Sequence, residues 1–167
     1  HRRLRGAQLA RLLRHHHGHH RLEDGRAADP VARAPAGGGG GKETIVNSSS
    51  AVSGTINLDF QTAQIFHYTG NAGGNWTVNF RGSSSVTLNN EMSTDQSLTF
   101  VLYVQQGSTA YYNNGWQIDG SGKTPKWLGG FGTPNSGHTN SVDVYTYTIM
   151  KIGNNDFRIY ANQNFYT

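Results

Sequence analysis

The stretch VDVYTYTIM, residues 142–150, decides how the fold of this chain is read. Its large side chains stand at alternate positions and are separated by threonines; they are Tyr145, Tyr147 and Ile149. A period of two built from β-branched and aromatic residues is typical of a strand that buries one face. Residues 157–161 follow after the turn sequence Gly153-Asn154-Asn155, so the two segments predict a closing β-hairpin.

Shorter segments upstream repeat this alternation. Residues 56–60 and 76–81 each predict a half-buried strand, whereas residues 98–104 are apolar at nearly every position and predict a central strand covered on both faces. Glycine-rich turns separate the segments, and no stretch after Lys42 has the 3.6-residue apolar period of an amphipathic helix. Residues 42–167 are therefore expected to form one all-β domain, an antiparallel β-sandwich or a jelly-roll-like fold.

The first 41 residues have a different composition. They lack Lys, Ser, Thr, Asn, Ile, Met and aromatic residues, all of which the rest of the chain uses, and they end in the glycine run 37–41. We interpret residues 1–41 as a low-complexity, flexible basic arm joined to the β domain by a glycine linker. Two origins stay open: an artefact of a misread frame or of a fragment, or a genuine basic arm.

The arm also contains a cluster of five histidines between His15 and His20. Neutral imidazoles on a flexible segment can bind nickel or zinc opportunistically. Their spacing fixes no tetrahedral geometry, however, and the chain has no cysteine to accompany them. We therefore predict no native metal site and no cofactor.

The positive charge is concentrated in the same arm. The formal net charge is +4, and residues 1–42 carry nine of the fourteen Lys and Arg residues, whereas five basic residues face seven acidic ones from Glu43 onward. A nearly neutral β domain argues against nucleic acid as a partner. No apolar run approaches the roughly 20 residues of a membrane-spanning helix, so no membrane association is expected.

The β domain contains no catalytic motif. Its two histidines, His67 and His138, lie in no recognisable motif, and its three strand-associated aspartates lie on or beside separate strands; they are Asp59, Asp119 and Asp143. A solvated strand face or a turn cap explains each aspartate more simply than a shared active site does. The sequence therefore predicts a structural or binding protein and not an enzyme.

Aromatic residues offer a candidate binding surface. Tyr111, Tyr112 and Trp116 lie close together in the sequence and flank the polar stretch Asn113-Asn114-Gly115. Flat rings beside short polar side chains suit a shallow saccharide or protein surface, because a ring covers apolar area at low entropic cost. For Tyr111 and Tyr112 both an exposed position and a core position stay open, whereas Trp76 and Trp127 are expected in the core.

Five segments together carry a resemblance to a known family. They are NWTVNFRG (75–82), QIDG (117–120), TPKWLGG (124–130), TP (133–134) and NSVDVYTYTI (140–149). They resemble a module of virion structural and tail-fibre-type proteins of tailed bacteriophages, with the closest likeness to those of marine T4-like cyanophages. The likeness spans about residues 55–167. Relative to the family pattern, Phe131-Gly132 is inserted before the TP pair.

The resemblance implies a non-enzymatic structural component of a phage particle, located in the virion and displayed on the particle or its fibres. Other virion proteins are the implied partners, and a homotrimer is expected from the family and from the symmetry of fibres. The alternative is a carbohydrate-binding or receptor-binding β-sandwich. Such a module would recognise a bacterial surface glycan of the host through Tyr111, Tyr112 and Trp116.

Overall fold

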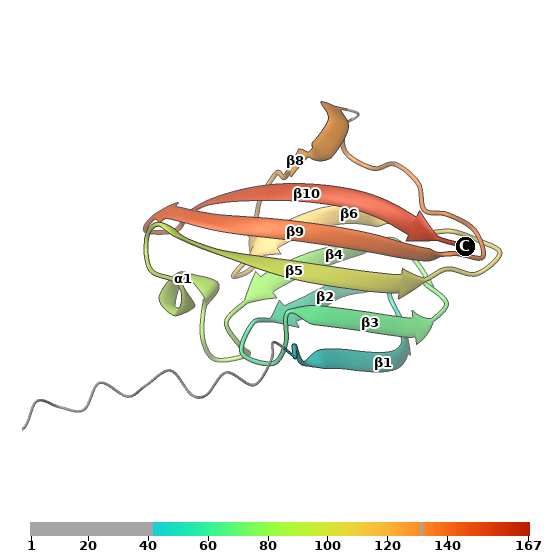
Figure 1. Ribbon diagram of the computed structural model, residues 1–167, viewed down its shortest axis with the longest axis horizontal. Helices are drawn as coiled ribbons and strands as arrows, with labels where there is room; N and C mark the ends of the chain where they lie inside the picture. The colour runs from blue at the N-terminus through green and yellow to red at the C-terminus, as the bar shows by residue number, and fades with distance from the viewer. Residues whose placement is uncertain (1–41, 131) are drawn as a thin grey trace, which may run out of the picture. The chain divides into compact units, whose positions relative to one another are not determined.

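The computed structural model of the protein describes residues 42–130 and 132–167. The basic arm expected at residues 1–41, its histidine cluster and the inserted Phe131 lie outside the described residues. The described part is a sandwich of two β-sheets (Figure 1). This confirms the expectation of an all-β sandwich.

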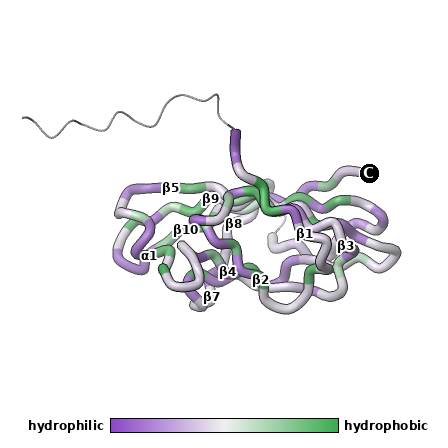
Figure 2. Tube along the Cα trace, turned by 90° about the horizontal axis from the view of Figure 1, so that it is seen from below, coloured by the Kyte–Doolittle hydropathy of each residue, from purple (hydrophilic) through white to green (hydrophobic). Residues whose placement is uncertain are grey.

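One sheet has six strands and the other has four. The six-stranded sheet has the order β1 (Ile45–Ala51), β3 (Ile65–Gly70), β5 (Gln96–Gln105), β9 (Val142–Gly153), β10 (Asp156–Tyr166) and β8 (Lys126–Trp127). The four-stranded sheet has the order β2 (Gly54–Asp59), β4 (Trp76–Arg81), β6 (Asn113–Ile118) and β7 (Ser121–Gly122). Figure 2 shows the two sheets as separate layers. The helical segments are short: α1 (Leu88–Glu91) and the 3-10 turn η1 (Leu128–Gly130).

The first six strands alternate between the two sheets. Strands β1, β3 and β5 are parallel neighbours in one sheet, and β2, β4 and β6 are parallel neighbours in the other. Each return to a sheet passes through a strand of the opposite sheet, so neighbours run in the same direction. The expectation of an antiparallel sandwich was therefore wrong for this half. Antiparallel pairing joins only β5–β9, β9–β10 and β6–β7 among the described strands, and β8 lies parallel to β10.

Both of the tight hairpins use residues with positive φ. The predicted closing hairpin is confirmed, with Gly153 opposite Asp156 and Asn155 at φ 55°. In the β6–β7 hairpin, Asp119 and Gly120 have φ values of 52° and 78°. Positive φ at both central residues is the backbone of a type I′ turn, for which Asp-Gly is a preferred pair.

The core lies between the inner faces of the sheets. Trp76 is only 1% exposed, as predicted, and Trp127 is partly buried against the same core. In β5 only one face is buried: Phe100 and Leu102 are inaccessible, but Thr99 is exposed and the outer residues Val101 and Tyr103 are half-buried. The expectation that β5 would be covered on both faces was wrong, because its apolar outer residues lie on a partly exposed sheet face.

Polar side chains form a ladder across β2 and β4. The Asn79 amide nitrogen donates to Asn57 Oδ1 at 2.9 Å, and Asn79 Oδ1 accepts from the Gly120 N–H at 2.9 Å. Two residues further along each strand, the Arg81 guanidinium donates to both carboxylate oxygens of Asp59, at 2.7 and 2.9 Å. The Asn79–Asn57 and Arg81–Asp59 contacts join residues that stand opposite each other in the parallel register, so they align β2 with β4.

Candidate functional site

Trp116 faces the interior of the sandwich. It lies on β6 opposite Val78, whose side chain is fully buried. Its ring meets that of Trp127 edge-on, with 5.5 Å between the centroids, and both rings pack partly buried against the core. The ring therefore covers the core beside β8 and is not part of a flat exposed surface.

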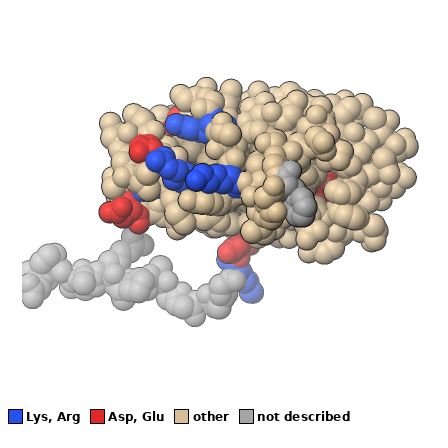
Figure 3. Space-filling model, turned by 90° about the horizontal axis from the view of Figure 1, so that it is seen from above, with Lys and Arg blue, Asp and Glu red and all other residues tan. Residues whose placement is uncertain are grey.

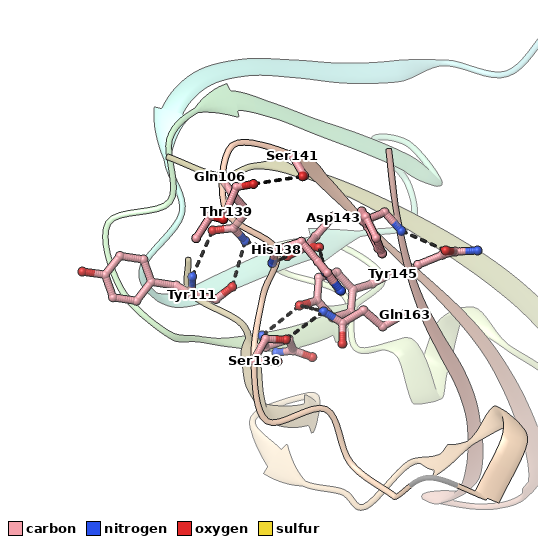
Figure 4. A network of polar contacts seen from close by, with 12 residues as sticks. Gln106, Tyr111, Ser136, His138, Thr139, Ser141, Asp143, Tyr145 and Gln163 are labelled. Carbon is pink, nitrogen blue, oxygen red and sulfur yellow. Dashed lines mark hydrogen bonds and ion pairs between the residues drawn. The ribbon is translucent and has the colours of Figure 1, made fainter. Parts of the chain in front are cut away.

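Tyr111 and Tyr112 precede β6 and are both half-buried. The backbone of Tyr111 is held at two points by Gln106: its N–H donates to Gln106 Oε1 at 3.0 Å, and its carbonyl accepts from Gln106 Nε2 at 2.8 Å. Figure 4 shows the Tyr111 ring pointing away from this network. The three sequence-selected rings thus do not lie side by side on one face, and their role in binding stays a prediction.

The main buried polar cluster is centred on Asp143, which is completely inaccessible. Its Oδ1 lies 2.6 Å from His138 Nδ1. Its Oδ2 accepts from the His138 backbone N–H at 3.2 Å and from Gln106 Nε2 at 2.9 Å (Figure 4). One carboxylate therefore ties the loop before β9 to Gln106, which directly follows β5.

The local chain geometry explains this position. Asp143 is the second residue of β9, and the two-residue period puts it on the same inner face as Tyr145. The His138 ring stacks on the Phe165 ring of β10, with centroids 3.8 Å apart and an interplanar angle of 13°. A Cβ added at Gly137 would collide with the Tyr111 carbonyl oxygen and lie 2.8 Å from Asp143 Oδ2, so only glycine fits there.

Two buried tyrosines extend the cluster into the core. The Tyr145 hydroxyl accepts from Gln163 Nε2 at 3.0 Å, and the Tyr147 hydroxyl donates to Asn113 Oδ1 at 2.8 Å. Burial raises the pKa of both phenols, and the charge of Asp143 further raises the pKa of Tyr145. Both phenols therefore remain neutral hydrogen-bonding groups across the physiological range.

The cluster is arranged to hold a loop. Within the described residues, the only hydrogen-bond partner of the His138 side chain is Asp143. Residues 42–130 and 132–167 also contain no group of three His, Cys, Asp or Glu side chains that is placed to hold a metal ion. What the geometry does provide is satisfied hydrogen bonds for a buried carboxylate and a fixed position for the segment around His138.

The pKa of Asp143 gives a testable pH dependence. Burial raises this pKa above its ordinary value, although hydrogen bonds from the His138 side chain, the His138 backbone and Gln106 act in the opposite direction. The folded protein therefore binds a proton at Asp143 more tightly than the unfolded chain does. The stabilisation from this group is fully present at low pH, below the ordinary pKa, and is lost as the pH rises through the raised pKa.

In the variant Asp143→Asn, this component of the pH dependence should disappear. The variant should also be less stable at every pH. The amide nitrogen of asparagine would replace one carboxylate oxygen, and a nitrogen donor cannot accept the hydrogen bonds of the N–H groups that this oxygen faces. Urea unfolding between about pH 3 and about pH 8 measures both effects. Parallel stability profiles for the two proteins would contradict a raised pKa at Asp143.

The other strand-associated aspartates serve separate local contacts. Asp119 accepts the N–H groups of Leu88 and Asn89 at 2.6 and 3.0 Å, and thereby caps the start of α1. Asp59 pairs with Arg81, as described above. His67 lies on the outer sheet face with its ring edge-on to Tyr103, at 5.9 Å between centroids. The structure therefore places the sequence-selected aspartates and His67 at different sites.

Sequence reasoning did not single out His138 and Gln106 as a pair with Asp143. One signal was present: the alternation in residues 142–150 puts Asp143 on the same face as Tyr145 and Tyr147, so a buried carboxylate in need of donors could be inferred. The two residues that donate to Asp143, His138 and Gln106, could not be predicted from any sequence pattern, because they lie in a loop and at the end of β5.

No family model matches the chain, and no curated protein or solved structure matches it. None of the helices within residues 42–130 and 132–167 has the length and apolar character needed to cross a bilayer.

Proposed function

We propose that residues 42–167 form a non-enzymatic structural module of a phage particle, of the virion or tail-fibre type. The observation that carries this proposal is the stacking of β1 to β6 as parallel strands in two sheets, with in-register side-chain pairs between β2 and β4. In stacked arrangements of this kind each unit is stabilised by its neighbours, which suits a rigid and passive building block. The resemblance of residues 75–82 and 117–149 to phage modules supports the same role.

Side-chain hydrogen bonds hold two of the segments that connect the strands. Asp143, His138 and Gln106 fix the segment before β9, and Asp119 fixes α1. Buried side chains with satisfied hydrogen bonds favour one conformation over others, at the expense of the mobility that many catalytic cycles need. This rigidity supports a structural role in a particle that must persist outside a cell.

An uncharged strip on the outer face of the six-stranded sheet supports a homo-oligomer. Ile45, Ile65 and Val101 stand opposite one another in the parallel register, and Ile45 is 55% exposed. With His67 and Tyr103, the two isoleucines line a shallow hollow. Exposed apolar side chains in register offer a contact surface for a second subunit, so we place the subunit contact of the proposed trimer on this strip.

The oligomer is tested by light scattering on the full chain. The expected mass is about three times the 18.2 kDa of one chain. The variant Ile65→Glu should reduce this mass to that of a monomer, because a charge would be buried in the contact. Tyr166→Glu, on the same outer face but on β10, two strands beyond β5, is the matched control and should leave the trimer intact. A monomeric parent protein would overturn the trimer.

Membership of the particle needs a separate experiment. Antibodies against residues 42–167, applied to purified particles of the phage that encodes the chain, are expected to label the particles in immunogold electron microscopy. Labelling absent from intact and disrupted particles would reject the structural role, whatever the oligomeric state.

A further inference from the structure

A groove lies between the β8–η1 segment and the outer surface of the β9–β10 hairpin. It has a volume of about 470 Å³ and is lined by Lys126, Trp127, Leu128, Gly129, Thr146, Thr148, Tyr160, Ala161 and Asn162. A second hollow of about 430 Å³ continues past Leu128 along residues 132–135 and shares four of these lining residues. We call the two hollows together the β8–β10 groove. Each volume is within the range of about 300–1,000 Å³ found for small-ligand sites.

The floor of the groove is formed by cross-strand pairs of the hairpin. Thr148 stands opposite Tyr160, and Thr146 stands opposite Asn162. These residues alternate with buried ones, so their side chains point outward. The Tyr160 side chain is 43% exposed. An aromatic ring, two hydroxyls and an amide therefore lie next to one another on a flat sheet surface.

The wall of the groove is preformed. Lys126 and Trp127 pair with Tyr160 and Ala161 of β10, and the Trp127 ring is anchored edge-on against Trp116 inside the sandwich. Gly129 and Gly130, at φ 83° and 71°, turn the chain sharply after Leu128, whose side chain is 73% exposed. The floor and the β8 part of the wall are both held in the sheet, so binding of a ligand there would cost the protein little ordering entropy.

The lining selects for an uncharged polar ligand. Among the residues that the structure describes, Lys126 is the only charged one in the lining, and no carboxylate contributes to either hollow. Figure 3, which looks at the domain from the side of β8 and β10 in Figure 1, shows Lys and Arg side chains gathered over one part of this face and uncharged residues over most of the rest. Of the basic residues that the structure describes, Lys126 is the one that lines the groove. A phosphate or sulfate group would be expected to meet several convergent basic groups. A sugar needs an apolar surface for its C–H face beside hydroxyl and amide partners.

We propose that the β8–β10 groove binds a neutral oligosaccharide, with one sugar ring against Tyr160 and hydrogen bonds to Thr146, Thr148 and Asn162. This site goes beyond the structural role proposed above and does not depend on it. It also differs from the surface selected in the sequence, since Trp116 faces the core and supports the groove only through Trp127.

The full chain is tested on an array of neutral glucan, galactan, mannan and bacterial O-chain oligosaccharides, followed by calorimetric titration with the best binder. Saturable binding is expected, and Tyr160→Ala should weaken it at least about tenfold. Thr148→Val, which keeps the shape and removes one hydroxyl, should weaken it less. Tyr166→Ala is the matched control: Tyr166 lies on the outer face of the same strand, is 65% exposed, and is outside the groove.

The outcomes separate the possible sites. Binding lost in Tyr111→Ala/Tyr112→Ala but kept in Tyr160→Ala would overturn the groove and support the surface selected in the sequence. No saturable binding by the folded protein to any sugar on the array would also overturn it, and immunogold labelling would be unaffected. If Tyr160→Ala unfolds, Thr148→Val and Asn162→Ala decide the question, since each removes a polar group without opening the core.

Discussion

Replacing Trp76 by alanine is expected to lower the free energy of unfolding by about 3–5 kcal/mol. Trp76 is 1% exposed on β4, and its ring meets the Tyr145 ring of the opposite sheet edge-on, at 5.6 Å between centroids. The truncation removes the largest fully buried side chain and leaves a cavity between the sheets. Because domains of this size are stable by about 5–15 kcal/mol, the variant should lose a large part of its stability.

Urea unfolding followed by circular dichroism measures this loss. Tyr166→Ala is the control, since that ring is 65% exposed, and its effect should stay within about 0.5 kcal/mol. Trp76→Phe should be milder than alanine, because the Trp76 indole N–H makes no hydrogen bond to residues 42–130 or 132–167, so its removal leaves no partner unsatisfied there. Equal stability of Trp76→Ala and the parent would contradict the position of this ring between the sheets.

The second large effect is expected for Gly137→Ala, at about 3 kcal/mol of destabilisation. The added Cβ would meet the Tyr111 carbonyl oxygen and lie 2.8 Å from Asp143 Oδ2. Neither neighbour can easily move, because Gln106 binds both the Tyr111 backbone and the Asp143 carboxylate. The substitution therefore disturbs the whole cluster and not one contact.

A matched glycine exists in the same domain. Gly122 in β7 has no heavy atom within 4 Å of an added Cβ and does not have a positive φ, so Gly122→Ala should change stability by less than about 0.5 kcal/mol. The two variants are compared by urea unfolding. A Gly137→Ala protein as stable as Gly122→Ala would show that the segment before β9 is not held against Tyr111 in solution.

The sequence predicted which residues share a face of each strand, but it did not predict whether neighbouring strands are parallel or antiparallel. Alternation in residues 76–81 and 142–150 separated the two faces of each strand, and the predicted core position of Trp76 is confirmed. The same alternation arises in parallel and antiparallel neighbours that bury one face, so it says nothing about pairing. The parallel order follows from the path of the chain between two sheets, which depends on contacts between distant segments.

For the candidate binding surface too, closeness in the sequence did not predict how the side chains are arranged in space. Tyr111, Tyr112 and Trp116 are near one another in the sequence, yet Trp116 turns inward because it follows the buried row of Val78 in β4. The groove at Tyr160 was not predicted, because its floor and wall come from separate strands and its threonines look like ordinary strand residues.

By itself, the sequence determined an all-β sandwich, its closing hairpin and the burial of Trp76, because each depends on local periodicity or turn chemistry. Only the tertiary structure decided the parallel stacking of β1 to β6, the donors that surround Asp143 and the groove between β8 and β10. These features join residues far apart in the chain. Their geometry is set by how the two sheets pack, and no local pattern of residues encodes it.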